Sequence, residues 1–311
     1  MLKFVLTDCD GNRFKVNSPL TVVFNSEYDV PADDITIMFP YDKKITDSIN
    51  LITAENNGKL VFKGTIDEIE NIKNDRAVIT RIKARSMAGV LLDNEAEPVT
   101  YDNVTADFIF GRHLLPFGID DFVADSTPLW DNLKIYKGMT HWQVYENFCK
   151  NLYGSVPRIT SDGVAVFNGG EFDEVLCFSD NSLGIGYYSI NEDNKKYKLI
   201  SKVMLKLKSF GGYVGSIENK NTDCKGITRV RLVNATADTS PVDTADKIIA
   251  HSNEDSYSVT LKCAGCLIDI MGNPCVVKDS VLGTKENLVV SKLRYVLDTD
   301  GENTSVELKR R

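Results

Sequence analysis

The sequence predicts an α+β fold that is mainly β, with two small β-barrel domains and a helical and β insert between them. Short alternating runs predominate in residues 1–98 and 187–311, whereas the main helical patterns lie at 99–186. Alternation with period two predicts half-buried strands, and a period near 3.6 predicts helices. About six strands in each β region are enough for a small barrel or a half-closed sheet. We therefore expect domain boundaries after residues 98 and 186.

Composition and charge limit the class of protein. The 311 residues are 42% hydrophobic, which is enough for packed cores in two or three domains. No signal peptide or transmembrane segment is expected, because charged residues interrupt the apolar runs. Seven scattered cysteines favour reduced thiols, made in a cytosol, over a disulfide framework. The formal net charge of −8 argues against sequence-specific DNA binding, because phosphate contacts need clustered cations.

The first domain begins with short strands separated by turn signals. The tripeptides Asp10-Gly11-Asn12 and Asn17-Ser18-Pro19 are typical of tight turns. The predicted strands are Phe4–Leu6, Phe14–Val16, Leu20–Phe24, Ile35–Phe39 and Ile49–Ile52.

A longer antiparallel pair follows from residue 59. Leu60 and Phe62 alternate with Val61 and Lys63 before a charged turn at residues 73–76. After this turn, Val78, Ile82 and Ala84 share one face of the strand. The other face carries three cations, Arg81, Lys83 and Arg85. Residues 85–92 fit either the end of this strand or a short helix.

The insert has two helical patterns and a hairpin. Asn103–Leu115 has helical spacing and ends before Pro116 and Gly118. Thr140 and Gln143 form a predicted capping box for a second helix, which ends at Gly154. Residues 159–166 predict a hairpin with its turn at 161–163. The helix has an apolar stripe, and aromatic residues predicted to build the insert's core are Trp130, Trp142 and Tyr145.

From Tyr187 the pattern returns to strands. Ile200–Lys208 alternates apolar residues with Lys202, Lys206 and Lys208. A short helix is expected at Ala245–Ala250. Further predicted strands are Tyr213–Ile217, Tyr257–Leu261, Leu267–Met271, Pro274–Lys278, Leu288–Leu297 and Ser305–Leu308.

Cysteine and aspartate motifs give no convincing metal site. Cys263, Cys266 and Cys275 have thiolates of the kind that hold zinc, but residues three apart in a strand point to opposite faces. We expect buried, protonated thiols there. Asp298-Thr299-Asp300-Gly301 lacks the glycine offset of a calcium loop, so a hairpin turn is expected.

Other candidate groups also point away from catalysis. His113, His141 and His251 are far apart along the chain, and no nucleophile elbow or zinc-protease motif is present. Gly184-Ile185-Gly186 lacks the third glycine of a phosphate cradle. Asp120 and Asp121 are expected on a solvated loop. The sequence therefore predicts no catalytic, cofactor or metal site, and the protein is not expected to be an enzyme.

Two stretches carry a specific resemblance to a known family. They are KLVFKGTIDEI followed by ARSMAGVLLDNEAEPVTY, within residues 59–101, and YKGMTHWQVYENFCKNLYGSVPRITSDG at 136–163. Both resemble the baseplate hub family of contractile phage tails. That family includes the Mu-like hub and late control protein D relatives, with counterparts in phage-tail-like bacteriocins and type VI secretion spikes.

The resemblance implies a structural protein. It implies a homotrimer in which two similar barrels per subunit mimic sixfold symmetry, so that the ring adapts a sixfold tail tube to a threefold central spike. The implied partners are further copies of the chain, the tail tube protein, the central spike protein, and tape-measure or other baseplate proteins. The protein would be made in a bacterial host cytoplasm and built into the baseplate of a virion or tail-like particle.

The exposed cations suggest where subunits would meet. A solvated sheet face is one interpretation, and a ring interface with acidic residues of neighbouring subunits is the other. The candidate interface residues are Arg81, Lys83, Arg85, Lys202, Lys206 and Lys208. Alternative functions are another ring protein of the same machine, a tail-associated peptidoglycan hydrolase and a carbohydrate-binding β protein.

Overall fold

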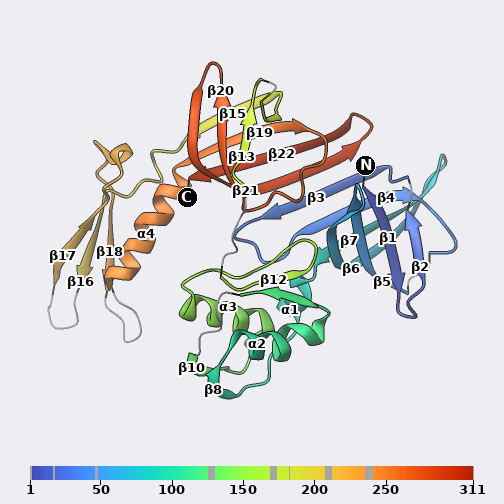
Figure 1. The fold of residues 1–311 in the computed structure, drawn as a ribbon, viewed down its shortest axis with the longest axis horizontal. Helices are drawn as coiled ribbons and strands as arrows, with labels where there is room; N and C mark the ends of the chain where they lie inside the picture. Colours follow the sequence, from blue (N-terminus) through green and yellow to red (C-terminus); the bar gives the residue numbers. More distant parts are fainter. Residues whose placement is uncertain are drawn as a thin grey trace. The chain divides into compact units, whose positions relative to one another are not determined.

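The computed structural model divides the chain into two compact units, whose elements are labelled in Figure 1. The described residues are 2–16, 18–45, 48–124, 130–168, 174–181, 183–206, 212–234 and 241–310. Unit 1 comprises residues 1–174, 264–271 and 292–304, and unit 2 comprises 175–263, 272–291 and 305–311. The three-domain division at residues 98 and 186 stays a prediction.

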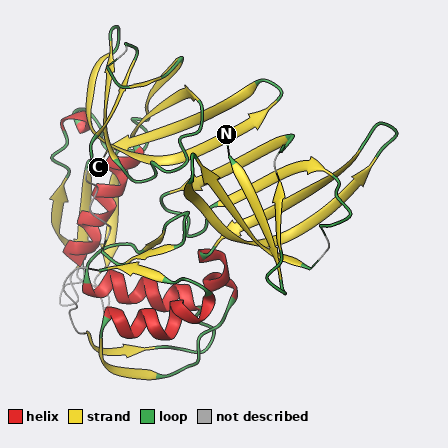
Figure 2. Cartoon of the chain, turned by 45° about the vertical axis from the view of Figure 1, so that its right-hand side comes forward, coloured by secondary structure: helices red, strands yellow, loops and turns green. Residues whose placement is uncertain are grey.

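Strands predominate in the chain, so the mainly β class is confirmed (Figure 2). Unit 1 contains β1 (Lys3–Asp8), β2 (Arg13–Val16), β3 (Thr21–Glu27), β4 (Asp34–Pro40), β5 (Ile49–Asn56), β6 (Lys59–Lys73) and β7 (Val78–Ser86). They pair antiparallel in the order β3-β4-β7-β6-β5-β1-β2. All five short strands predicted before residue 59 are confirmed.

Alternation along each strand builds the core of this sheet. The burial pattern of β3 alternates strictly between half-buried and buried positions. Its inward residues Val22 and Phe24 are fully buried, and the Phe24 ring lies edge-on to Phe62 of β6 at a centroid distance of 6.0 Å. One face of the sheet therefore supplies most of the apolar burial that stabilises it.

Gly64 permits close approach between β6 and β7. A Cβ atom at this position would lie 2.2 Å from the carbonyl oxygen of Arg85. Only a residue without a side chain fits this contact, which explains the glycine within a strand.

No ladder between the described residues closes a sheet into a barrel. β2 forms one end of the ladder in unit 1, and β14 (Ile185–Gly186) forms an end in unit 2. The residues of β21 (Gly283–Asp298) that belong to unit 1 pair antiparallel with β3. The two predicted barrels are corrected to open ladders, because β2 and β14 each pair with only one neighbouring strand among the described residues.

The insert is an α+β layer within unit 1. Its strands are β8 (Thr100–Val104), β9 (Asp121–Val123), β10 (Trp130–Lys134), β11 (Arg158–Ile159) and β12 (Val164–Val166). Its helices are α2 (Ala106–Ile109), the π turn η1 (Phe110–Leu114), the 3₁₀ turn η2 (Leu115–Phe117) and α3 (His141–Leu152), and α1 (Ala88–Asp93), which precedes residue 99, packs in the same core. α1 resolves the open choice at residues 85–92, since the strand ends at Ser86 and a short helix follows.

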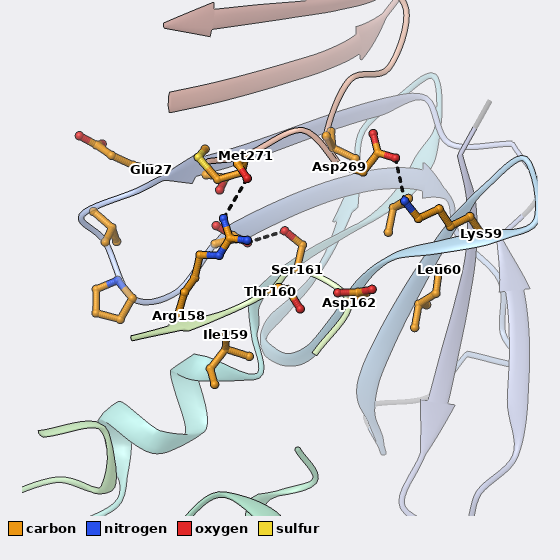
Figure 3. A pocket seen from close by; sticks show the side chains of 16 residues that line it. Glu27, Lys59, Leu60, Arg158, Ile159, Thr160, Ser161, Asp162, Asp269 and Met271 are labelled. Atoms are coloured by element: carbon orange, nitrogen blue, oxygen red, sulfur yellow. Dashed lines mark hydrogen bonds and ion pairs between the residues drawn. The ribbon is translucent and has the colours of Figure 1, made fainter. Parts of the chain in front are cut away.

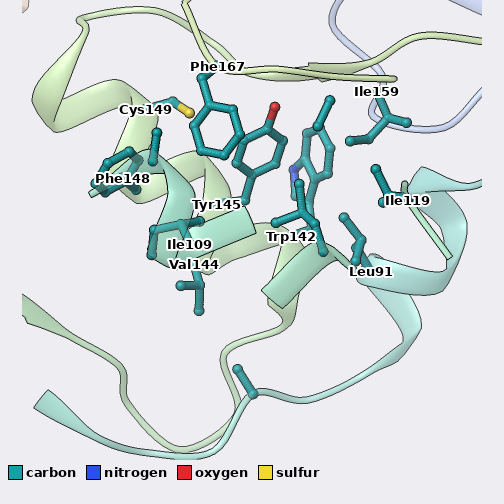
Figure 4. Close-up of a cluster of buried hydrophobic side chains, with 14 of the residues drawn as sticks. Leu91, Ile109, Ile119, Trp142, Val144, Tyr145, Phe148, Cys149, Ile159 and Phe167 are labelled. Carbon is teal, nitrogen blue, oxygen red and sulfur yellow. The ribbon is translucent and has the colours of Figure 1, made fainter. Parts of the chain in front are cut away.

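The second helix and the hairpin predicted for the insert are confirmed, and the helix predicted at Asn103–Leu115 is confirmed in part. Residues 103 and 104 belong to β8, with Asn103 at a φ of +54°, and the helical part begins at Ala106 in α2 and continues through η1. Thr140 Oγ1 accepts a hydrogen bond from Gln143 N at 3.2 Å, and Gln143 Oε1 accepts one from Thr140 N at 2.9 Å. β11 and β12 pair around the turn at 161–163. Trp142 and Tyr145 are buried in the insert's core, with Tyr145 packed edge-on against Phe167 (Figure 4). The side chain of Trp130 lies outside the described part of the structure.

Unit 2 contains two sets of strands. The larger set is β13 (Leu176–Ser179), β14, β15 (Ser189–Asn194), β19 (Tyr257–Ala264), β20 (Pro274–Asp279), the first part of β21 and the last part of β22 (Gly301–Arg310). The smaller is a three-stranded sheet of β17 (Tyr213–Glu218), β16 (Lys202–Lys206) and β18 (Val230–Asn234), with α4 (Pro241–Asp255) packed on one face. The predicted helix at Ala245–Ala250 lies inside α4.

One predicted strand is wrong. Residues 267–271 form turns, although their apolar and polar residues alternate. Gly265 and Gly272 on either side have φ values of +88° and +81°, and this left-handed backbone cannot continue a strand. None of the described helices has both the length and the apolar character needed to cross a membrane.

Candidate assembly surface

The three cations predicted on one face of β7 each face a carboxylate of the same chain. Arg81 Nε donates to Glu70 Oε2 at 2.8 Å, and Lys83 Nζ lies 2.6 Å from Glu68 Oε2. Arg85 Nε donates to Asp67 Oδ2 at 2.8 Å, and its Nη1 donates to Asp93 Oδ1 at 3.2 Å. We call this set, with Glu70, Glu68, Asp67 and Asp93, the ion-pair ladder.

Strand register creates the ladder. Glu70 pairs with Arg81 and Glu68 pairs with Lys83 across β6 and β7. The register shifts between Ile66 and Glu68, so that Asp67 is an extra residue in β6. A bulge of this kind re-aims a side chain, and here it lets Asp67 reach Arg85.

The ladder is electrostatically satisfied within the chain. The hydrogen bonds that Arg85 donates to Asp67 and then to Asp93 raise the pKa of Arg85, and the hydrogen bond that Lys83 donates lowers the pKa of Glu68. These side chains are partly exposed, and such surface pairs each contribute about 0–1 kcal/mol. The role of Arg81, Lys83 and Arg85 at a subunit interface stays a prediction.

The predicted cations of unit 2 lie on the small sheet. Lys202 Nζ is 3.9 Å from Glu218 Oε1 on the neighbouring β17, and Lys206 is half-buried at the end of β16. Lys208 lies outside the described residues. Beside them on β18, Val230 and Leu232 are exposed, with Leu232 at 60%. The alternation in VRLVN could have revealed these apolar residues, which the sequence analysis missed.

A second exposed apolar feature was also missed. Val281 is 87% exposed and Leu183 is 80% exposed, on two loops of unit 2 that hydrogen bonds hold together. Ser280 N donates to Asp180 Oδ2 at 2.9 Å, and Asp180 N donates to Lys278 O at 3.4 Å. We call Leu183, Val281 and the neighbouring Leu282 the apolar tip.

Hydrogen bonds to Asp279 hold the turn that carries Val281 and Leu282 of the apolar tip. Asp279 Oδ1 accepts hydrogen bonds from Val281 N at 2.9 Å and Leu282 N at 2.7 Å, while Asp279 Oδ2 accepts one from Tyr187 Oη at 2.6 Å. These bonds lower the pKa of Asp279, with the Leu282 amide as the largest cause. Exposed aliphatic side chains on an ordered turn are typical of protein contact sites. Two adjacent aliphatic residues in a turn, before Gly283, were the available sequence signal.

A cavity of about 220 Å³ lies where the insert meets the sheet inside unit 1 (Figure 3). Ser161 Oγ donates to Asp33 Oδ2 at 2.7 Å, and Arg158 Nη1 donates to Met271 O at 2.9 Å. Burial raises the pKa of Asp33 and lowers that of Arg158. Lys63 N donates to Ser161 O at 2.7 Å, which fixes the tip of the hairpin on β6. The cavity thus marks a polar joint that positions the insert.

Two acidic candidates have structural roles. Asp120 forms an ion pair of 2.8 Å with Lys63, and Asp121 Oδ1 accepts a hydrogen bond from Phe122 N. Asp298 Oδ1 accepts a hydrogen bond from Asp300 N at 2.9 Å in the β21–β22 turn, as expected for a hairpin.

The cysteines are free thiols. Burial raises the pKa of Cys263 to about 11 and that of Cys275 to about 12, so both thiols stay protonated at neutral pH. Within the described ranges, no group of three or more His, Cys, Asp and Glu side chains could hold a metal ion. Ile185 and Gly186 form β14, paired with β13.

Two of the histidines that are far apart along the chain are in contact in the fold. His113 Nδ1 and His141 Nδ1 are 3.0 Å apart in the insert. They are 28 residues apart along the chain, so only the fold of η1 against α3 brings them together.

Comparison with solved structures identifies proteins that have this fold. No protein-family model and no curated protein matches the chain. The solved tail protein from Neisseria meningitidis is 17% identical, with a TM-score of 0.77 over 99% of this chain and 96% of that one. The 43 kDa tail protein of prophage MuSo2 from Shewanella oneidensis is 15% identical, with a TM-score of 0.77 over 99% and 98% of the chains.

A more distant likeness extends to secretion systems. An Escherichia coli protein described as a component of the type VI secretion system is 10% identical, with a TM-score of 0.56 over 94% of this chain and 74% of that one. That protein is itself described as structurally similar to the T4 bacteriophage tail proteins gp27 and gp5. Along nearly its whole length, then, this chain has the fold of phage and prophage tail proteins.

Proposed function

We propose that the chain is the structural baseplate hub of a contractile injection tail. In this proposal three copies form a ring that adapts a sixfold tail tube to a threefold central spike. The observation that carries it is the likeness to two tail proteins over nearly the full length of all three chains.

The open ladders support assembly into a ring. β2 in unit 1 and β14 in unit 2 are end strands in the described part of the sheet. Unpaired strand edges favour association with another chain, and a closed ring covers them without leaving a growing end. The hub would act mechanically, by seating the spike and setting the width of the channel.

Contacts in the ring would involve several surfaces. The ion-pair ladder is the proposed polar contact of unit 1, and Lys202, Lys206 and Lys208 are the proposed polar contacts of unit 2. The apolar tip would supply the hydrophobic part, because interfaces need a dry, well-packed centre as well as a polar rim.

Spike binding is proposed by analogy. A Francisella complex of PdpA with VgrG contains a chain similar to this one, with a TM-score of 0.59 and 10% identity over 100% of this chain and 58% of that one. By the same analogy, we propose that this chain binds a spike protein, a tail tube protein and a tape-measure protein. The proposed site of action is a virion or tail-like particle made in a bacterial host.

Class averages of the purified protein by negative-stain electron microscopy test this function. The proposal predicts rings with threefold symmetry and a central channel. Single, unassociated particles at every protein concentration would count against it. A zymogram on bacterial cell walls tests the alternative of a tail-associated peptidoglycan hydrolase, since clearing would identify lytic activity that a hub does not have.

A further inference from the structure

The insert contains a pair of histidines in direct contact. His113 belongs to η1 and is only 2% exposed, and His141 is the first residue of α3. Their Nδ1 atoms are 3.0 Å apart and their ring centroids 5.0 Å apart. This contact joins two segments that are not neighbours in sequence.

The surroundings of the pair disfavour a positive charge on either imidazole. The Phe117 ring lies 4.5 Å from the His141 ring, and the Tyr101 ring lies 5.9 Å from the His113 ring. Nε2 of His113 is buried and has no hydrogen-bond partner among the described residues. A proton added there would carry charge into an apolar site with no acceptor.

The hydrogen bond itself depends on protonation. Two imidazoles that meet through Nδ1 share one proton, so that one ring donates and the other accepts. When both rings are imidazolium, two N–H groups with like charge face each other. The contact therefore cannot persist in the doubly protonated state.

Neighbouring charges also oppose protonation. The positive charge of Arg112 in η1 lowers the pKa of both His113 and His141. Glu97, before β8, forms an exposed ion pair of 3.2 Å with Arg112. Tyr101 of β8 is the largest cause of the raised pKa of Arg112. His141 lies at the N-terminus of α3, a helix of twelve residues whose dipole disfavours a cation there.

We propose that the His113–His141 contact is an acid-sensitive joint, which holds η1 against the start of α3 at neutral pH and opens when both rings are protonated. The joint is independent of the proposed function, since it concerns only the insert's own stability. Opening would loosen the packing around Trp142, the residue after His141, which is buried.

The direction of the pH effect follows from the pKa shifts. Burial is the largest cause for both residues, and it lowers the pKa of His113 from 6.5 to about 4. The open state, with more ordinary pKa values, then binds more protons than the closed state. The closed joint consequently loses stability as the pH falls below about 6.5 towards about 4.

Tryptophan fluorescence tests the joint. The chain has two tryptophans, so the Trp130→Phe variant leaves Trp142 as the sole reporter. We expect a reversible red shift of its emission during acid titration, with a midpoint below 6.5. In a Trp130→Phe, His113→Asn, His141→Asn variant, whose amides occupy the Nδ1 positions, this shift should be absent. The same shift in that variant, or no shift with both histidines present, would overturn the proposal.

Histidine NMR provides a test that does not depend on the variants folding. The chain has three histidines, and His251, with a side chain that is 78% exposed, serves as a solvent-exposed reference. We expect the ring signals of His113 and His141 to titrate below the ordinary value of 6.5. Titration of both at or above that value would show that the contact does not resist protonation, and the joint would be refuted.

Discussion

Asp33 is the residue on which the position of the insert depends most directly. Its carboxylate accepts a hydrogen bond from Ser161 of the hairpin turn, and its backbone N–H donates to Ser86 Oγ at the end of β7. Arg158 lies close enough to lower the pKa of Asp33, although burial outweighs this effect and raises it. One side chain thus links a turn of the insert to the sheet.

The Asp33→Ala variant should lower the free energy of unfolding by about 1–3 kcal/mol, because the half-buried Ser161 loses its acceptor and the half-buried Arg158 loses a countercharge. Asp33→Asn should lower the free energy of unfolding by less, because the amide still accepts a hydrogen bond from Ser161. The amide is also uncharged, so it avoids the cost of burying a carboxylate, the same cost that raises the pKa of Asp33. Urea unfolding measures both. Asp34→Ala, an exposed neighbour, is the matched control and should change stability by less than about 0.5 kcal/mol. Equal losses for Asp33→Ala and Asp34→Ala would contradict the assignment.

For single residues, the sequence predicted which strand face a side chain lies on, but not which residues it pairs with. Alternation placed Arg81, Lys83 and Arg85 together on one side of a strand, as the structure has them. It did not identify Glu70, Glu68 and Asp67 opposite, because those pairs depend on the register and on a bulge. The His113–His141 contact was equally hidden, since nothing local relates residues that a fold brings together.

The β6–β7 pair is the element that defines unit 1, and its geometry depends on Gly64. The Gly64→Ala variant places a Cβ against the Arg85 carbonyl at 2.2 Å, so the strands must move apart. We expect a loss of about 1–3 kcal/mol in unfolding free energy, as for other overpacked sites. Gly111→Ala, which meets nothing within 4 Å in a helical turn, is the control and should be neutral or stabilising. Similar stability of the two variants would refute the close approach.

The apolar tip is a set of exposed aliphatic side chains. Val281→Asp should leave the unfolding free energy nearly unchanged, because the side chain is 87% exposed. Under the proposed function it should weaken subunit association about tenfold or more, because a charge replaces a buried anchor. Sedimentation velocity compares this variant with Val175→Asp, a control at an exposed residue directly before β13. Equal association of both variants would show that the tip makes no subunit contact.

Regular elements were predictable and irregular ones were not. The capping box of α3 was found because its two hydrogen bonds need Thr and Gln three residues apart. The segment 267–271 alternates like a strand but lies between two glycines with positive φ. Local alternation cannot reveal that such glycines turn the chain.

For the whole molecule, the sequence gives the class and the order of its parts but not closure of the sheets. Strand counts in residues 1–98 and 187–311 permit a barrel or an open sheet, and pairing of the end strands decides between them. In the described residues β2 and β14 end their ladders. Whether another subunit covers those edges is a property of the assembly, which a single chain does not encode locally.

A charge swap separates folding from assembly. Lys83→Glu alone should destabilise the ladder by a few tenths of a kcal/mol through repulsion from Glu68, and adding Glu68→Lys should restore the pair. If the ladder contacts a neighbouring subunit, the double variant will fold like the original but associate less. Urea unfolding and sedimentation velocity measure the two properties. Unchanged association would limit the ladder to a role within one chain.

The central claim is that copies of this chain form a trimeric ring. Light scattering coupled to size-exclusion chromatography, across a series of protein concentrations, measures the mass in solution directly. The proposal predicts a mass three times that of the 34.6 kDa chain. The mass of a single chain at every concentration would contradict a self-assembling ring.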